Sequence, residues 1–217
     1  MAVSRIGVLG SGAVGTTLAN GFLKHGYEVM RGSREPAKLA GWKLDAGAHS
    51  AIGSFAEAAA FGEIVVLAVK GLAAESVIDL VGPANLAGKT VIDTTNPIAA
   101  APPDQGVLPF FTTLDDSLME RLQRKAPAAH FVKAFSCVGN ALMVDPRLPG
   151  GPPTMFLCGD DANAKAAVVR ILEQFGWEIS DLGGAKAARA IEPLCMLWCI
   201  PGLLGQGWLH AYKVLKP

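Results

Sequence analysis

Short apolar runs alternate with amphipathic segments along the first half of the chain. The continuous apolar runs at 5–10 and 63–69 are typical of strands buried on both faces of a parallel sheet. Between such runs, apolar residues recur at four-residue spacing, as Val14, Leu18 and Phe22 do, which predicts helices. The expected order is strand 5–10, helix 13–26, strand 27–32, helix 35–42, helix 55–62, strand 63–69, helix 72–82 and strand 89–95.

The second half of the chain is richer in loops. Nine of the fourteen prolines fall between positions 97 and 153, and the compositions of 100–111 and 145–153 predict loops. The remaining elements are expected as helix 114–124, strand 130–135, strand 154–159, helix 161–176, strand 177–183 and a closing helical region from about 185. This alternation predicts an α/β fold with a doubly wound parallel sheet and a C-terminal helical extension.

No linker composition divides the chain. We therefore expect a single domain over 1–217, with about 185–217 as a closing helical segment at a dimer interface. Hydrophobic residues make up 51% of the chain, and 19 basic residues balance 19 acidic ones. A neutral surface gives no reason to expect nucleic acid or a membrane as partner, whereas a high apolar fraction at zero net charge fits a homodimer.

Several features predict a cytoplasmic location. The N-terminal residues lead directly into a strand and lack the apolar stretch of a signal peptide. The most apolar stretch, 190–209, contains Glu192 and two prolines, which argues against a membrane-spanning helix. The four cysteines, at 137, 158, 195 and 199, form no CxxC pair, so we expect reduced thiols in a reducing compartment and no metal site.

A glycine-rich turn follows the first expected strand. Gly10, Gly12 and Gly15 have G-x-G-x-x-G spacing between a strand and a helix, the context of a Rossmann-type dinucleotide site. The first glycine makes the tight turn, the second lets the backbone approach the pyrophosphate, and the third lets the helix pack on the strand. The cofactor-binding loop is therefore predicted to comprise Gly10, Ser11, Gly12, Ala13, Val14 and Gly15.

The residues after the second strand indicate which dinucleotide binds. NAD sites usually place an acidic residue there to hold the ribose hydroxyls. This chain instead has Arg31, Ser33, Arg34 and Lys38, and a hydroxyl with two or three cations suits a 2′-phosphate. Glu35 precedes a proline and is interpreted as a helix N-terminal acid. The cofactor is predicted to be NADP(H).

The motifs GSGAVG, GSREPAK, VIDTTNPI, FVKAFSCVG and CGDD occur in this order along the chain. In this respect the sequence resembles the F420-dependent NADP reductases and the oxidoreductase domain of the STEAP metalloreductases, over nearly its whole length. The resemblance implies a deazaflavin or flavin as second substrate, F420, FMN or FAD, and closing helices that help to form a dimer.

The resemblance also implies roles for particular residues. The 2′-phosphate region would be held by Ser11, Ser33, Arg34 and Lys38. The ribose and nicotinamide would be lined by Val69, Lys70, Asn96 and Pro97. The segment near the nicotinamide and the second substrate would be Ala134, Phe135, Ser136 and Cys137. Relatives often have FNT where this chain has 135–137, and Lys70 replaces an apolar or proline residue; both departures concern the second-substrate side.

No acid–base pair stands out, and we assign no catalytic side chain. Hydride transfer from NADPH to a flavin-like ring needs proximity and a dry pocket more than a proton donor. Lys70 is interpreted as a cofactor contact, with a proton donor for a carbonyl substrate and a solvent-exposed residue as alternatives. Cys137 is interpreted as a pocket wall or reactive thiol, and His130 as a structural residue far from the ligand edge. Phe110 and Phe111 are expected to pack against the sheet edge or a dimer partner, or to form a lid over the ring of the second substrate.

The sequence therefore predicts an NADPH-dependent oxidoreductase acting on a small-molecule, flavin-like electron acceptor. Two alternatives stay open. One is a redox sensor that binds NADP(H) without turnover. The other is an imine or 2-hydroxy acid reductase, although only about 30 residues follow the last strand, few for a substrate domain within one subunit.

Overall fold

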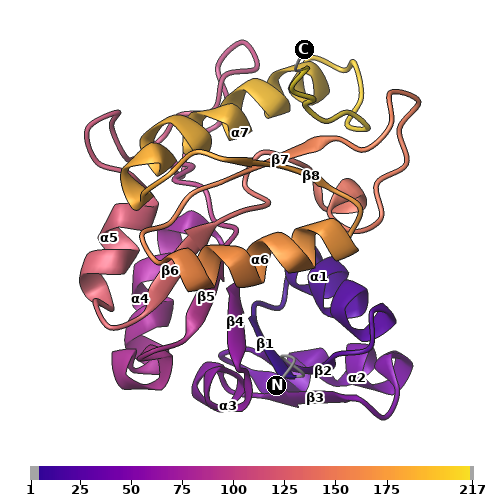
Figure 1. Cartoon of the computed structure of the whole chain (residues 1–217), viewed down its shortest axis with the longest axis vertical. Coiled ribbons are helices and arrows are strands. Elements are labelled where there is room, and N and C mark those ends of the chain that lie inside the picture. The colour runs from indigo at the N-terminus through magenta and orange to yellow at the C-terminus, as the bar shows by residue number, and fades with distance from the viewer. Residues whose placement is uncertain (1–4, 216–217) are drawn as a thin grey trace.

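Six parallel strands form the main sheet of the computed structural model, which describes residues 5–215 (Figure 1). Their order across the sheet is β3-β2-β1-β4-β5-β6, that of a doubly wound dinucleotide-binding fold. The strands are β1 Arg5–Leu9, β2 Glu28–Gly32, β3 Ser50–Gly53, β4 Ile64–Leu67, β5 Thr90–Asp93 and β6 His130–Lys133. The chain reverses direction across the sheet between β1 and β4, so a ligand crevice is expected at their carboxyl ends.

Helices cover both faces of this sheet, as the continuous apolar strands require. In β4, Ile64 and Val66 belong to one core with α1 and α6, whereas Val65 and Leu67 belong to another with α3, α4 and α5. The helices are α1 Ala13–Lys24, α2 Ala40–Ala46, α3 Phe55–Phe61, α4 Gly71–Val81, α5 Leu118–Lys125, α6 Ala162–Gln174 and α7 Ala188–Leu203.

A second, two-stranded parallel sheet pairs β7 (Thr154–Leu157) with β8 (Glu178–Asp181), with α6 between them in sequence. It joins the main sheet where Lys133 of β6 pairs with Cys158. In Figure 1, α7 and the C-terminal end lie at the top of the molecule, far from α3 and β3. The predicted α/β fold with a parallel sheet and a helical C-terminal segment is confirmed.

Some elements differ from those expected from the sequence. β3 was not predicted, because its four residues are only partly apolar and it lies at the sheet edge. The closing segment expected to be helical over 185–217 begins with one short 3-10 helix, Ala185–Ala187, and continues as α7 only to Leu203; residues 216 and 217 lie outside the described residues. Gly205 and Gly207 then adopt positive φ, and the chain returns in an extended form to β7, where Thr154 N donates to Tyr212 O.

His210 falls within the closing segment that was expected to be helical, but it lies beyond the end of α7. It lies on the returning chain and stacks on Trp198 of α7 with ring centroids 5.0 Å apart.

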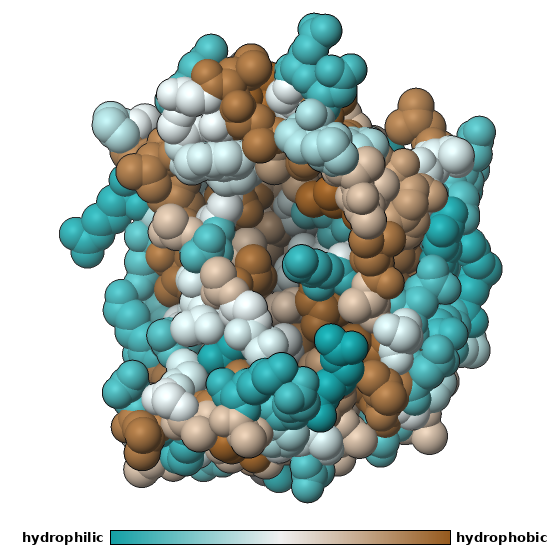
Figure 2. Space-filling model, turned by 180° about the vertical axis from the view of Figure 1, so that it is seen from behind, coloured by the Kyte–Doolittle hydropathy of each residue, from teal (hydrophilic) through white to brown (hydrophobic). Residues whose placement is uncertain are grey.

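Apolar side chains, seen as brown atoms, gather at the top of the face in Figure 2, at the end of the molecule where Figure 1 places α7. Within residues 5–215 no helix is long and apolar enough to cross a membrane.

Candidate cofactor-binding site

The glycine loop joins β1 to α1 at the carboxyl edge of the sheet. Gly10 adopts φ +155°, and a Cβ atom there would lie 2.1 Å from Ala68 O at the end of β4. A Cβ atom at Gly15 would lie 2.6 Å from Gly10 O. These two glycines are therefore required by packing within the protein: the first lets two strand ends approach, and the third seats the helix on the turn.

Gly12 has a different environment. It is the N-cap of α1 with φ −81°, which any residue adopts, and a Cβ atom there would meet nothing within 4 Å. No side chain caps α1, and no acidic residue lies in its first turn. The first N–H groups of the helix therefore have no side-chain partner at the cap, and Ser11, Gly12 and Ala13 beside them are exposed. Such a helix start is suited to a phosphate group.

The residues after β2 form a second, more exposed part of the site. Ser33 is buried, and its Oγ accepts a hydrogen bond from Glu35 N at 3.2 Å, whereas Arg34 is exposed. Lys38 Nζ lies 2.7 Å from Glu35 Oε1, and this contact lowers the pKa of Glu35. Glu35 lies at the N-terminus of the short 3-10 helix Pro36–Leu39, as predicted, although its side chain makes no capping hydrogen bond and pairs with Lys38 instead. Arg34 and Lys38 are thus both exposed cations of the predicted 2′-phosphate site, and Lys38 is paired with Glu35.

Arg31 does not join these surface cations. It lies on β2 beside Val8 of β1 and is only 1% exposed, with Nη2 donating to Gly10 O at 3.1 Å. The sequence could have indicated this burial, because side chains two positions apart on a strand share one face and Val29 faces the core. Counting Arg31 among the cations exposed after β2 was therefore wrong.

The loops at the carboxyl edge touch one another in a row. Gly10 N donates to Gly32 O at 3.0 Å, linking the ends of β1 and β2. A Cβ atom at Gly71, the first residue of α4, would lie 1.9 Å from Asn96 O, so the turns after β4 and β5 are in contact. Asn96 Nδ2 in turn donates to Ser136 O at 2.7 Å, joining the turn after β6. The sequence-predicted residues therefore follow one continuous edge from β2 to β6.

Burial divides these residues into surface groups and wall groups. Lys70 is exposed at the N-cap of α4, and Val69 and Asn96 are half-buried. Pro97, Ala134, Ser136 and Cys137 are buried. Two of the buried polar atoms, Asn96 Oδ1 and Ser136 Oγ, have no hydrogen-bond partner within residues 5–215. Because buried polar atoms are normally paired, these two atoms stand out from the other polar groups of the edge.

Phe135 directly precedes Ser136, whose Oγ has no hydrogen-bond partner among the described residues. It has φ +63°, a left-handed conformation that is rare for a bulky side chain, and it is 1% exposed. Such backbone strain persists where packing over-determines it and often occurs at functional sites. The strained turn sets the direction of the Ser136 carbonyl that Asn96 binds.

A buried ion network lies beneath the turns after β5 and β6, and sequence reasoning missed it. Lys133 Nζ lies 2.7 Å from Asp93 Oδ2 and 2.9 Å from Glu192 Oε1, and donates to Thr95 O at 2.8 Å. All three charged side chains are 2% exposed or less. The two carboxylates raise the pKa of Lys133, although burial alone would lower it.

Both carboxylates of the network also fix backbone. Glu192, on α7, accepts from Leu118 N and Met119 N at 2.9 and 3.0 Å and so caps α5. Asp93 Oδ1 accepts from Thr95 N and Thr95 Oγ1 at 2.9 and 2.7 Å. The network therefore holds α5, α7 and the turn that carries Asn96 in one arrangement.

The cysteines are free thiols with different environments. Burial raises the pKa of Cys137 to about 11, so it stays protonated at neutral pH. Cys195 is buried and Cys199 half-buried, and the hydrogen bond between them lowers the pKa of Cys199 while it raises that of Cys195. The burial of Cys137 and its raised pKa argue against the reactive-thiol alternative.

We expect iodoacetamide at pH 8 to label Cys199 before any other cysteine in the native protein and to leave Cys137 unmodified. A thiol with a pKa of about 11 is roughly one part in a thousand thiolate at this pH. Peptide mapping by mass spectrometry checks the order of labelling, with Cys199→Ser as control. Labelling of Cys137 as fast as that of a free thiol contradicts the expectation, whereas labelling of Cys137 after unfolding agrees with it.

Other sequence candidates lie away from the edge. His130 opens β6 at the amino end, 3.7 Å from Asp161, which confirms its predicted structural place. Phe111 packs on the core beneath Arg121, so the packing alternative holds for it. No group of three His, Cys, Asp or Glu side chains in the described part of the chain is arranged to hold a metal ion.

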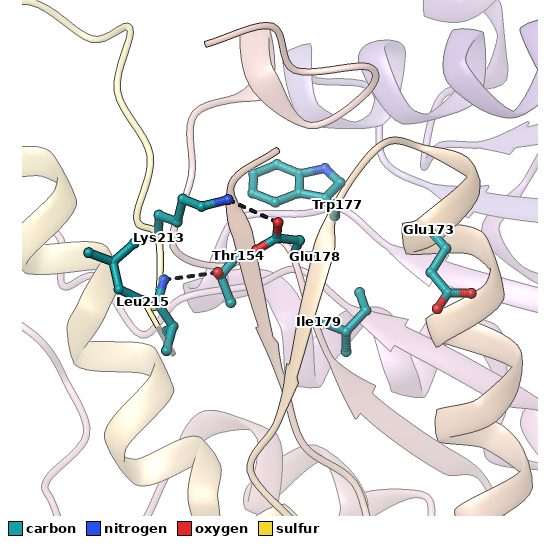
Figure 3. A pocket seen from close by; sticks show the side chains of 8 residues that line it. Thr154, Glu173, Trp177, Glu178, Ile179, Lys213 and Leu215 are labelled. Carbon is teal, nitrogen blue, oxygen red and sulfur yellow. Dashed lines mark hydrogen bonds and ion pairs between the residues drawn. The ribbon is translucent and has the colours of Figure 1, made fainter. Parts of the chain in front are cut away.

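The cavity in Figure 3 is a different region. It measures about 650 Å³ and lies between β7, β8, the end of α6 and the returning C-terminal chain. Lys213 reaches across one side to Glu178 at 2.9 Å, and Trp177 stands beside Glu178. Its lining residues are Thr154, Glu173, Trp177, Glu178, Ile179, Lys213, Val214 and Leu215, none of which belongs to the predicted site.

A doubly wound parallel sheet with a glycine turn after β1 defines the dinucleotide-binding Rossmann class. Residues 5–97 match the family described as NADP oxidoreductase, coenzyme F420-dependent. A crystal structure from Arthrobacter sp. FB24, provisionally named an F420-dependent NADP-reductase, is 35% identical with a TM-score of 0.90, and the match covers 99% of this chain and 100% of that one. The chain belongs to this family of NADP-dependent oxidoreductases, which confirms the resemblance.

More distant relatives agree with this fold. Metalloreductase STEAP3 of Rattus norvegicus is 30% identical over 220 residues, which cover 98% of this chain but 42% of that protein. The chain thus spans less than half the length of this curated relative. A reductive aminase from Aspergillus terreus, solved with NADPH and ethyl levulinate, has a TM-score of 0.66 at 22% identity, with 94% of this chain and 63% of that one covered. At that identity the likeness concerns the fold alone.

Proposed function

We propose that the chain binds NADP(H) along the edge from β2 to β6 and transfers a hydride between it and a flavin-like acceptor, F420 or a flavin. When bound, the cofactor supplies or accepts the hydride at its nicotinamide ring. The observation that supports the proposal most directly is the pair of unpartnered atoms Asn96 Oδ1 and Ser136 Oγ. A carboxamide group has an NH2 donor and a C=O acceptor, which an amide oxygen and a hydroxyl group complement.

The described residues fit a dinucleotide at both ends. The open N-terminus of α1 at Gly12 and the exposed Arg34 offer N–H groups and positive charge for phosphates. Ser33, Lys38, Ser11, Ala13 and Val14 complete this end in the proposal, with Val69, Lys70 and Pro97 along the middle. Asn96 and Ser136 orient the amide at the other end, and Ala134 and Cys137 form a dry wall behind it.

Direct hydride transfer agrees with the side chains at this edge. The polar groups nearest the proposed nicotinamide end are a neutral amide, a hydroxyl and a thiol whose pKa burial raises to about 11. None of them is a carboxylic acid or imidazole tuned to donate a proton at neutral pH. A carbonyl or imine substrate needs such a donor, whereas a ring acceptor takes a hydride without one, which is why we propose a ring acceptor.

The acceptor is tested by following NADPH oxidation at the nicotinamide absorbance. F420, FMN, FAD, riboflavin and a ferric chelate are supplied one at a time, with NADH in parallel. Turnover with one ring acceptor supports the proposal. Tight NADPH binding without turnover on any of them overturns it and favours a sensor or a reductase of a small imine or 2-hydroxy acid.

Arg34→Ala is expected to weaken NADPH binding by roughly 10- to 100-fold and to leave NADH binding unchanged. A hydrogen bond to a charged group contributes about 1.5–3 kcal/mol, and only NADPH has the 2′-phosphate. Fluorescence titration with both dinucleotides measures the two dissociation constants. Arg147→Ala is the control, since this exposed arginine lies two residues from Asp145, which contacts His25 at the far end of α1. Equal weakening of NADPH and NADH by Arg34→Ala argues against a 2′-phosphate contact.

A further inference from the structure

Arg31 is a buried cation without a counter-anion. It is 1% exposed, and its Nη2 donates to Gly10 O at 3.1 Å. Its Nε has no hydrogen-bond partner, and no carboxylate forms an ion pair with it among residues 5–215. The Trp42 ring lies under the guanidinium with the centroid 4.8 Å away. Burial lowers the pKa of Arg31 to about 10, because nothing compensates its charge.

Such an arrangement costs free energy in the protein alone. Buried charges are normally paired, since a carbonyl contact and an aromatic face replace only part of the lost hydration. The position on β2 is otherwise an ordinary core position, flanked by Val8 on β1 and Ile52 on β3. Met or Leu would fill it without this penalty. The charge therefore points to an anion that belongs to a ligand.

The guanidinium lies directly beneath the glycine loop. The guanidinium donates a hydrogen bond to the carbonyl oxygen of Gly10, the first glycine of the loop. This hydrogen bond offsets the partial negative charge of that oxygen. Gly12, two residues further, opens the N-terminus of α1 to ligand. The Trp42 indole that supports Arg31 is itself fixed by donating to Asn20 Oδ1 of α1 at 2.7 Å. Both strand and helix thus hold the charge under the predicted phosphate position.

We propose that Arg31 sets the affinity for the dinucleotide from beneath the loop, with the pyrophosphate of the cofactor as its missing counter-anion. This inference rests on the proposed function, because it requires a dinucleotide at the glycine loop. Arg31 acts through its field and through the Gly10 carbonyl, not through contact with the 2′-phosphate. It therefore favours NADPH and NADH alike, whereas Arg34, exposed beyond β2, favours NADPH alone.

The test compares Arg31→Gln with Arg31→Lys. Both variants keep a hydrogen-bond donor, but only Arg31→Lys keeps the positive charge. Arg31→Gln is expected to raise the dissociation constants of both NADPH and NADH about tenfold, and Arg31→Lys by less than about threefold, because a buried charge acts through an effective dielectric constant near 20 rather than 80. Fluorescence titration measures both. In the absence of ligand, Arg31→Met is expected to melt at or above the wild-type temperature, since it removes an unpaired charge from the core.

Three results overturn the inference. One is equal binding by Arg31→Gln and Arg31→Lys, which shows that the charge has no effect. Another is a loss for NADPH alone, which places Arg31 with Arg34 at the 2′-phosphate. The third is a lower melting temperature of Arg31→Met with unchanged affinity of Arg31→Gln, which assigns a structural role. Failure of the wild-type protein to bind either dinucleotide, by contrast, overturns the proposed function and is recognised before any variant is compared.

Discussion

Lys133→Met is expected to lower the free energy of unfolding by about 3–5 kcal/mol, the cost of breaking a buried ion pair from one side. The substitution leaves Asp93 and Glu192 facing each other without the cation that lies 2.7 and 2.9 Å from them. Neither carboxylate can turn to solvent, because both are 2% exposed or less. Denaturant unfolding measured by circular dichroism, with the slope checked for a change, gives the difference.

A surface ion pair and a second substitution make this prediction specific. Lys165 lies 2.9 Å from Asp181, whose side chain is 43% exposed, so Lys165→Met is expected to cost less than about 1 kcal/mol. Adding Glu192→Gln to Lys133→Met is expected to recover part of the loss, because it removes one of the two uncompensated charges. If Lys133→Met costs no more than Lys165→Met, the network contributes little to stability.

The elements and the glycine turn could be predicted because their signals are local. The apolar run at 63–69 predicts a buried strand, and the G-x-G-x-x-G spacing predicts the turn after the first strand; each pattern spans only a few residues. The buried network could not be predicted, since Asp93, Lys133 and Glu192 lie on β5, β6 and α7 and meet only through the tertiary fold. The same is true of Asn96 and Ser136, which are joined by one hydrogen bond across forty positions.

The closing segment illustrates the opposite error, an over-extended local signal. Its apolar residues continue past Leu203, so the pattern favours a helix, yet the chain turns at Gly205 and Gly207. The course of the chain after Leu203 is fixed by contacts between residues distant in sequence. His210 stacks on Trp198, and Tyr212 O accepts a hydrogen bond from Thr154 N of β7. Composition gives no means of weighing such long-range contacts against helix propensity.

Gly12→Asp is expected to weaken NADP(H) binding by more than about 100-fold and to leave the protein as stable as the wild type or more so. Aspartate is a favoured N-cap residue, and α1 has neither a side-chain cap nor an acidic residue in its first turn. The new side chain meets no protein atom within 4 Å of its Cβ. In the proposed complex, however, it occupies the position nearest the pyrophosphate and places a negative charge against it.

Opposite changes in stability and affinity are what separate a ligand-binding glycine from a structural one. Gly150→Asp, in the loop before β7, is the control for the added charge, because a Cβ atom there also meets nothing within 4 Å. Thermal unfolding without ligand and titration with NADPH measure the two effects. A Gly12→Asp protein that is stable and binds NADPH as tightly as the Gly150→Asp control removes the glycine loop from the binding site, and with it the assignment of the carboxyl edge. A stable variant that no longer binds NADPH indicates that position 12 is glycine so that the ligand can approach the backbone. Gly10 and Gly15, by contrast, are required by packing within the protein.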